Sequence, residues 1–234
     1  MDATQAQDTP HDRYRRQFLN LLLENRPDSV LDVGCGGGGL IRDLTERGCR
    51  TAGIEFDRAK VDEATKDGLD VQTGRGEALP FAADSFDTVT FQFVTHHLES
   101  LDQGLREAMR VARKAVFILD GWYDVTVESQ RVAADFDAWS KAIDRQTGMI
   151  HNECPSPAAL MAPLAGVEGV SLQYGLHLYL QPLTVESIRS AGQAQLARIT
   201  DDGMAARRLG EILRRAEKHG ASDDGAVILA ARKP

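Results

Sequence analysis

The chain has 234 residues, of which 42% are hydrophobic and 26% charged, so it is long enough for one sizeable globular α/β domain. Its net charge of -8 and its pI near 5.3 argue against nucleic acid as a general partner, because that partner needs a basic surface. The sequence shows neither a membrane-spanning apolar run nor the order of a signal peptide, and three cysteines without metal-ligand spacing favour a reduced, cytoplasmic compartment.

The first half of the chain alternates between helix and strand patterns. Residues 1 to about 10 are typical of a disordered leader, and apolar residues at helical spacing predict a helix over His11–Glu24. Strands are then expected at Ser29–Val33, Thr51–Glu55, Asp70–Gln72, Thr88–Gln92 and Ala115–Asp120, and helices at Leu40–Arg47, Ala59–Lys66 and Leu101–Arg113. This alternation predicts a parallel sheet whose ligands bind beyond the carboxyl ends of its strands.

The pattern changes after Asp120. Helices are expected at Val125–Arg145, Pro157–Leu164, 184–200 and Met204–His219, and strands at Val170–Tyr174, His177–Leu180 and Ala226–Ala231. We predict a single α/β domain over residues 1–234, with a cofactor-binding core at about 28–120. Substrate or lid helices are expected within about 125–165 and 184–219, and those at 184–219 either cover the ligand crevice as a lid or pad the edge of the sheet.

The glycine-rich run after Val33 is the most informative stretch of the sequence. An apolar strand ends there and turns through glycines into a helix, a pattern that lets a ligand approach the backbone closely. The run fits the dinucleotide fingerprint Gly-x-Gly-x-x-Gly, and it also fits an acid-x-Gly-x-Gly-x-Gly pattern that begins at Asp32. A carboxylate at the mouth of the loop repels a pyrophosphate, whereas it attracts an ammonium and a sulfonium.

Further motifs follow in order along the chain. They are Thr51–Asp57, which ends a strand in acidic residues, the Leu-Pro-Phe segment Glu77–Phe81, Ser85–Val89, and Arg106–Val111. Together with the glycine loop they resemble the class I S-adenosylmethionine-dependent methyltransferases. The resemblance implies a Rossmann-like, doubly wound sheet of seven mostly parallel strands with an antiparallel last strand, S-adenosyl-L-methionine as cofactor, and a small-molecule acceptor.

The resemblance also implies a set of cofactor contacts. They are Asp32, Gly34, Gly36, Gly38, Glu55, Phe56, Gly76, Glu77, Leu79 and Gln92. The glycines would approach the methionyl part, the carboxylate of Glu55 would accept both ribose hydroxyls, and Phe56 and Leu79 would lie against the two faces of the adenine.

Arg75 departs from the commonest pattern of the family. Many members have an aspartate there that contacts the adenine amino group, and arginine cannot accept that hydrogen bond. Glu77, a backbone carbonyl near Gly76, or a water molecule is therefore expected to bind the edge of the adenine.

Three residues are the candidates for acid–base chemistry. His96 and His97 follow the fourth predicted strand and Asp120 ends the fifth, a layout that resembles some sugar O-methyltransferases of this class. One histidine would take the acceptor's proton while Asp120 orients it. Alternatively, catalysis rests on positioning alone. His96, His97, His151, His177 and Asp120 could converge on a metal, but they lack diagnostic spacing, so we predict no metal.

Aromatic residues are expected to build the acceptor pocket. They are Tyr14 and Phe18 on the first helix, and Trp122 and Tyr123 after the fifth strand. The predicted function is methyl transfer to a small molecule, with oxygen slightly favoured over nitrogen or carbon and with no nucleic-acid or membrane partner. A nicotinamide-dependent oxidoreductase and a cofactor-binding protein without transfer are the alternatives, and the choice between monomer and homodimer stays open.

Overall fold

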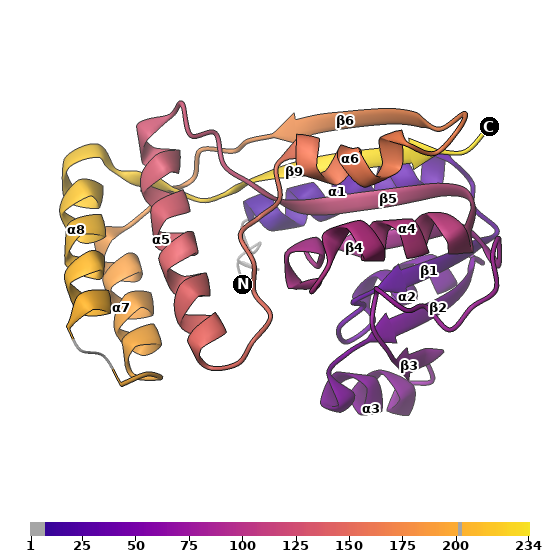
Figure 1. The fold of residues 1–234 in the computed structure, drawn as a ribbon, viewed down its shortest axis with the longest axis horizontal. Coiled ribbons are helices and arrows are strands. Elements are labelled where there is room, and N and C mark those ends of the chain that lie inside the picture. The colour runs from indigo at the N-terminus through magenta and orange to yellow at the C-terminus, as the bar shows by residue number, and fades with distance from the viewer. Residues whose placement is uncertain (1–7, 201–202) are drawn as a thin grey trace, which may run out of the picture.

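A seven-stranded sheet forms the centre of the computed structural model, which describes residues 8–200 and 203–234 (Figure 1). Across the sheet the strands are β3 (Val71–Thr73), β2 (Arg50–Glu55), β1 (Ser29–Val33), β4 (Phe86–Gln92), β5 (Ala112–Trp122), β9 (Gly225–Arg232) and β6 (Ser171–His177). The first five are parallel, and β9 runs antiparallel to both of its neighbours. The predicted Rossmann-like sheet with an antiparallel last strand is confirmed.

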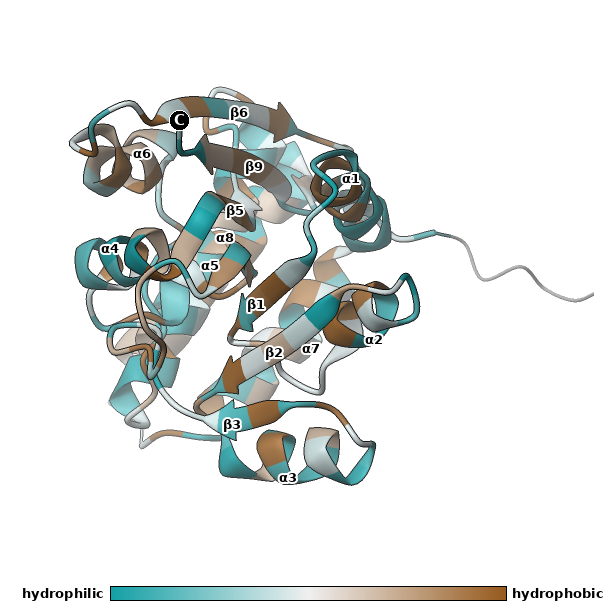
Figure 2. Cartoon of the chain, turned by 90° about the vertical axis from the view of Figure 1, so that its right-hand side faces the viewer, coloured by the Kyte–Doolittle hydropathy of each residue, from teal (hydrophilic) through white to brown (hydrophobic). Residues whose placement is uncertain are grey.

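Helices cover both faces of this sheet (Figure 2). α1 (Pro10–Glu24) and α2 (Gly39–Thr45) lie on one face, α4 (Leu101–Val111) and α6 (Pro157–Ala165) lie on the other, and α3 (Arg58–Lys66) packs with α2 beside β3. The two apolar faces of the strands are thereby buried, which is the main stabilising contribution in such a layered fold. The expected leader lies mostly outside the described residues, and α1 begins at Pro10 under a Thr9 capping box.

Three helices pack on one another beyond the end of β5 (Figure 1). They are α5 (Glu128–Gln146), α7 (Val185–Leu196) and α8 (Met204–His219), and we call them the three-helix unit. Their shared apolar cluster contains Trp139, Ile188 and Leu209. The short strands β7 (Pro182–Leu183) and β8 (Ala221–Ser222) pair at its base. The sequence left open whether the helices at 184–219 cover the crevice or pad the edge of the sheet. These helices stand beyond the strand ends and do not pad that edge.

The second half of the chain differs from the expectation in two further places. The predicted substrate helices included residues 157–165, but α6 buries Leu160 and Leu164 in the core on the face of the sheet. The structure has one strand, β6 (Ser171–His177), where two were expected at Val170–Tyr174 and His177–Leu180, because β9 offers a continuous partner from Arg232 to Ala226. Residues 178–180 are not part of a strand. Within the described residues, no helix combines the length and apolarity needed to cross a membrane.

Candidate functional site

The glycine loop joins β1 to α2 and is held against the neighbouring strand. The backbone N–H groups of Gly34 and Cys35 both donate to the carbonyl of Ile54, over 2.7 and 3.1 Å. Gly34 has a φ of +71°, and a Cβ there would lie 2.5 Å from the side chain of Val94. Gly36 also has a positive φ, of +55°, but it faces open space. The loop is thus packed closely against the segment after β4 and stays open on the side where a ligand can approach.

Glu55 fixes the conformation of this loop. Its carboxylate is 8% exposed, and it accepts one hydrogen bond from the Gly36 N–H over 2.8 Å and another from the Asp57 N–H over 2.9 Å. Charge-assisted bonds of this kind are stronger than bonds between neutral groups. The sequence suggested a ribose contact for Glu55, whereas its bond to the loop backbone could not be anticipated from the motif.

Asp32 lies buried at the end of β1. The Thr90 hydroxyl donates to its Oδ1 over 2.9 Å. Burial, together with the negative charge of Glu55, raises the pKa of Asp32 to about 7, although the bond from Thr90 opposes this shift. Two buried carboxylates therefore lie beside the glycine loop, and no Lys or Arg forms an ion pair with either of them among the residues described.

Asp32→Asn is expected to make the unfolding free energy less dependent on pH. Because the folded-state pKa of Asp32 exceeds its ordinary value, folding takes up a proton, and the wild type loses this stability as the pH rises from about 4 to about 7. The stability of the variant relative to wild type should therefore grow by about 2–3 kcal/mol between pH 5 and pH 8. Urea unfolding at both pH values measures this. Asp62→Asn, an exposed control, should show no such trend, and a parallel trend in both variants would contradict the prediction.

A hollow of about 830 Å³ opens over the loop. Its lining includes Arg15 and Leu19 from α1, Asp32, Gly34, Gly36 and Gln92 from the strand ends and the loop, and Arg42 from α2. Asp32, Gly34, Gly36 and Gln92 therefore share one concave surface. Gly38 does not line it, and a Cβ on Gly38 would clash with the side chain of Leu69. α1 contributes to it through polar and aliphatic side chains, not through the aromatic residues that the sequence suggested.

Two of the predicted pocket residues lie elsewhere. Tyr14 and Phe18 are fully buried between α1 and the sheet, where the Tyr14 hydroxyl donates to the Asp224 carbonyl over 3.0 Å. The expectation that they line the acceptor pocket is wrong, because the apolar stripe of α1 faces the core. Trp122 and Tyr123 are partly buried at the carboxyl end of β5, and their substrate role stays a prediction.

The residues expected around the adenine differ in exposure. Phe56 is 66% exposed, with the guanidinium carbon of Arg75 5.1 Å from its ring centre, so Phe56 is available to a ligand. Leu79 is instead buried in the core, which corrects its expected contact with the adenine. Gly76 is buried, and a Cβ there would lie 2.8 Å from Leu98. Glu77 accepts from the N–H of Glu99 over 2.6 Å, so this carboxylate orders the segment before α4.

His96 and Asp120 form a hydrogen-bonded pair at the ends of β4 and β5. His96 belongs to the 3-10 turn η1 (Thr95–His97), and its Nδ1 lies 2.6 Å from Asp120 Oδ1. The fully buried carboxylate also accepts from the Gly121 N–H over 2.7 Å and from the Thr95 hydroxyl. Burial opposes the charge of Asp120, but the bonds from His96, Thr95 and Gly121 hold its pKa below the ordinary value. The structure thus brings two of the three predicted acid–base residues together.

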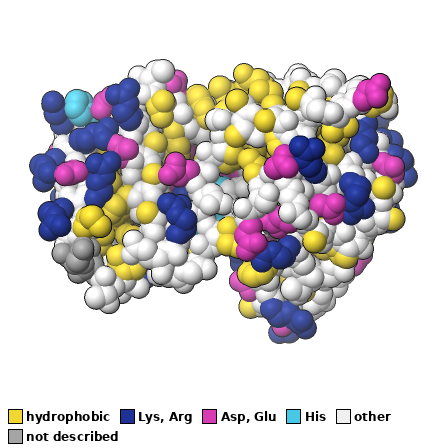
Figure 3. All heavy atoms as spheres, viewed as in Figure 1, with side chains coloured by type: hydrophobic (Ala, Val, Ile, Leu, Met, Phe, Trp, Pro, Cys, Tyr) yellow, Lys and Arg dark blue, Asp and Glu magenta, His cyan; other side chains and the backbone are white. Residues whose placement is uncertain are grey.

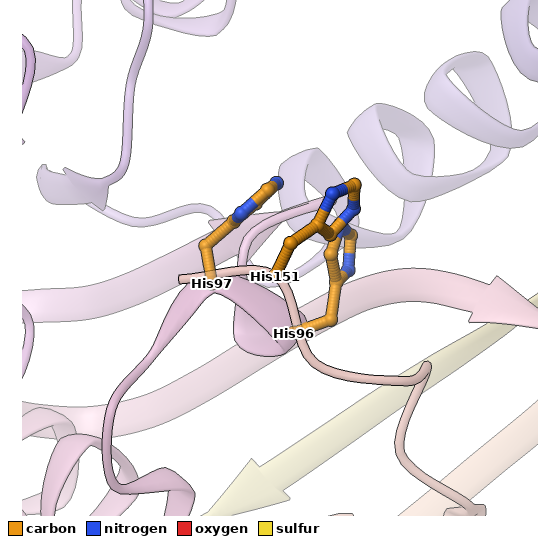
Figure 4. Close-up of side chains that lie close together, drawn as sticks. All are labelled: His96, His97 and His151. Carbon is orange, nitrogen blue, oxygen red and sulfur yellow. The ribbon is translucent and has the colours of Figure 1, made fainter. Parts of the chain in front are cut away.

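His97 does not contact Asp120 through a hydrogen bond, and a third histidine, His151, lies beside His96 and His97 (Figure 4). His97 Nδ1 lies 2.8 Å from the carbonyl oxygen of Ile150, and His151 Nδ1 lies 2.7 Å from Asp144 Oδ2. Desolvation by neighbouring groups lowers the pKa of both rings. His151 comes from the loop after α5, and nothing in its sequence spacing from His96 predicted that the two would lie together.

The surface is hollowed between the three-helix unit and the sheet (Figure 3). The carboxyl ends of the parallel strands face the three-helix unit in Figure 1, and the loops with the glycine turn and the histidines leave the sheet at those ends. A small acceptor could therefore reach the histidines from this side, as the crevice rule for open α/β sheets predicts.

Comparison with known proteins shows which sequences and folds this chain is similar to. Residues 31–119 match the family described as Methyltransferase domain. A demethylmenaquinone methyltransferase of Beutenbergia cavernae is 33% identical over 102 residues, which span 43% of this chain and 42% of that protein. A malonyl-[acyl-carrier protein] O-methyltransferase of Enterobacter lignolyticus is 26% identical over 68% of this chain and 63% of its own length. The fold matches YcgJ of Bacillus subtilis with a TM-score of 0.65 and 18% identity, over 93% of this chain and 98% of that one.

Proposed function

We propose that this chain is a class I methyltransferase that transfers a methyl group from S-adenosyl-L-methionine to a small-molecule acceptor, because residues 31–119 match the family described as Methyltransferase domain. The match spans less than half of the relative from Beutenbergia cavernae, so the acceptor has to come from the site itself. The observation that carries the proposal is the pair of buried carboxylates, Asp32 and Glu55, beside an open glycine loop.

The residues at the loop fit this cofactor by their charge and shape. Gly36 faces open space, so a ligand can contact the backbone there, and the hollow beside it is large enough for a nucleoside with an amino-acid tail. Asp32 would face the ammonium, and Glu55 would accept hydrogen bonds from the ribose hydroxyls while it holds the loop. Phe56, exposed at the end of β2, would pack against the adenine.

Methyl transfer needs an aligned acceptor and, when that acceptor carries a proton, a group that removes it. The bound cofactor supplies a methyl group on a positively charged sulfur, which is a good leaving group. The protein aligns the acceptor behind that methyl and excludes water, and such alignment accounts for a large share of the rate. If the acceptor is a hydroxyl, its proton must leave. Nε2 of His96 can take the proton because Asp120 holds Nδ1.

The acceptor atom is proposed as oxygen, since the His96–Asp120 pair is the kind of base that a hydroxyl acceptor needs. The similar proteins include a malonyl-[acyl-carrier protein] O-methyltransferase and a demethylmenaquinone methyltransferase, so a malonyl thioester and demethylmenaquinone belong in the panel of acceptors tested. Asp120 acts as a positioning residue and does not itself touch the acceptor.

Isothermal titration with adenosylhomocysteine and with NADH tests the cofactor assignment. Because of the two carboxylates, adenosylhomocysteine should bind with a dissociation constant in the micromolar range, and NADH should not bind measurably. Incubation with a methyl-labelled donor and an acceptor panel then tests transfer. Saturable binding of NADH alone would refute the proposed cofactor, and binding of adenosylhomocysteine without label in any acceptor would favour a cofactor-binding protein.

A further inference from the structure

Three imidazoles from two distant parts of the chain lie together beside the strand ends. His96 and His97 belong to η1, and His151 comes from the loop between α5 and α6 (Figure 4). Their ring centres are 4.4 to 5.4 Å apart. One ring nitrogen of each lies within 4.8 Å of one from each of the others. The His151 ring is stacked on both of the others, and the His96 and His97 rings are tilted relative to each other.

The hydrogen bonds of these rings orient their nitrogen atoms. Each Nδ1 faces an oxygen of the protein: Asp120 for His96 at 2.6 Å, the Ile150 carbonyl for His97 at 2.8 Å, and Asp144 for His151 at 2.7 Å. A carbonyl or a carboxylate accepts, so Nδ1 carries the proton and Nε2 of the neutral ring keeps its lone pair. This is the arrangement of histidine ligands in metalloproteins, where an oxygen partner fixes the ring and makes the other nitrogen more basic.

The backbone also fixes the loop of His151 to the segment of His96. The N–H of Asn152 donates to the His96 carbonyl over 2.7 Å, and its side-chain amide donates to the Leu98 carbonyl over 2.8 Å. These bonds keep the backbone of His151 against that of His96 and His97 without help from a ligand. A preformed set of this kind loses little conformational entropy when an ion binds.

We propose that Nε2 of His96, His97 and His151 together bind a divalent transition-metal ion of the Zn²⁺ type. Zinc binds imidazole nitrogen at about 2.0–2.1 Å, which places the three nitrogens about 3.3 Å apart. The His151 ring is stacked on the other two, so it has to tilt before its lone pair faces the same ion. Three histidines leave the fourth position open, as in catalytic rather than structural zinc sites.

A second group of possible ligands is less suitable. Cys154 lies near His96 and Asp120, but its sulfur accepts from the ammonium of Lys141 over 3.0 Å, and burial raises the pKa of this thiol to about 12. The carboxylate of Asp120 is already bound by three donors. The sequence predicted no metal because the spacing of the histidines is irregular, and only the fold brings His151 to the other two.

The metal site goes beyond the proposed methyl transfer and does not depend on it. Both the metal site and the proposed methyl transfer involve His96. An ion bound to Nε2 of His96 uses the lone pair that would otherwise take the acceptor's proton. Metal binding is therefore measured directly, apart from activity, on the full chain after chelator treatment and dialysis. Zn²⁺ is titrated against a chromophoric chelator, and Co²⁺ is added separately because a tetrahedral site gives it strong visible absorption.

We expect one Zn²⁺ per chain with micromolar or tighter affinity and a higher Tm in its presence. His151→Ala should weaken binding at least tenfold, and Asp144→Ala, which removes the oxygen that holds Nδ1 of His151, should weaken it about 10- to 100-fold, the usual effect of losing such a partner. His177→Ala, a partly buried histidine on β6 away from this group, should bind like wild type.

The metal site would be overturned if the folded wild type showed no saturable Zn²⁺ binding up to a 100-fold excess. It would also be overturned if the His151→Ala and His177→Ala variants bound Zn²⁺ with equal affinity, or if the Co²⁺ spectrum were typical of six-coordinate surface sites. Circular dichroism and Tm of each variant without metal separate loss of ligands from loss of folding. Binding of Zn²⁺ by a protein that transfers no methyl group would support the metal site and refute the proposed function, so the two outcomes stay distinct.

Discussion

Glu55→Ala is expected to weaken the binding of adenosylhomocysteine by at least about 30-fold. The variant loses the carboxylate that would receive the ribose, and it also loses the bonds to the Gly36 and Asp57 N–H groups that shape the loop. A hydrogen bond to a charged group contributes about 1.5–3 kcal/mol, so losing even one accounts for about a 10- to 150-fold change. Titration calorimetry on the folded variant measures the effect directly.

Two companion variants separate ribose contact from loop support. Glu55→Gln keeps the shape and one acceptor oxygen, so it should lie between wild type and Glu55→Ala. Glu63→Ala removes an exposed carboxylate on α3 and should leave the affinity unchanged. An affinity for adenosylhomocysteine that is the same in all four proteins would remove Glu55 from the cofactor site.

The first half of the fold could be predicted because each element carries its own local signal. Strand β1 is a short apolar run that leads into glycines, and α4 has an apolar stripe at helical spacing after the cap Ser100. Short crossovers then leave few possible topologies for the sheet. The same local signals could not say which face of a helix meets the core. The periodicity that predicts α1 therefore left open whether Phe18 lines a pocket or packs inward, and the structure buries it.

The second half could be predicted less well, because its elements are defined by tertiary contacts. α6 is an apolar segment with prolines, and its place on the face of the sheet depends on Leu160 and Leu164 meeting the core. The pairing of β7 with β8 joins residues about 40 positions apart in sequence, and neither segment has a strand pattern of its own. The approach of His151 to His96 has the same cause, since α4, β5 and α5 separate them along the chain.

In the candidate site, too, contacts within one motif could be predicted, whereas contacts that depend on the tertiary fold could not. Asp32, the glycines and Glu55 lie in one short β-α-β unit, so their proximity follows from the motif alone. The His96–Asp120 pair could be predicted because β4 and β5 are parallel neighbours, His96 follows β4, and Asp120 lies near the carboxyl end of β5. Neither pattern could show that Asp120 also binds Thr95 and Gly121, which makes it a structural anchor as well as a partner of His96.

His96→Ala is expected to lower kcat for a hydroxyl acceptor by about 10²–10⁴-fold, the usual contribution of a general base, while the affinity for adenosylhomocysteine stays within about twofold. His97→Ala should lower kcat by less than about tenfold, because the Nδ1 of His97 bonds to the Ile150 carbonyl and its ring is exposed. Initial rates with a labelled methyl donor, measured on chelator-treated protein, give both values without any contribution from bound metal.

Asp120→Asn tests whether the carboxylate acts through His96. The amide keeps an acceptor oxygen for the ring but loses the charge that stabilises an imidazolium, so kcat should fall by about 10- to 1000-fold with little change in KM. A merely structural role would instead lower Tm and raise KM along with the loss of rate. If His96→Ala and Asp120→Asn both keep near-normal kcat while Glu55→Ala still loses the cofactor, the base is unnecessary. Alignment of the acceptor would then carry the reaction, as expected for a nucleophile that has no proton to lose.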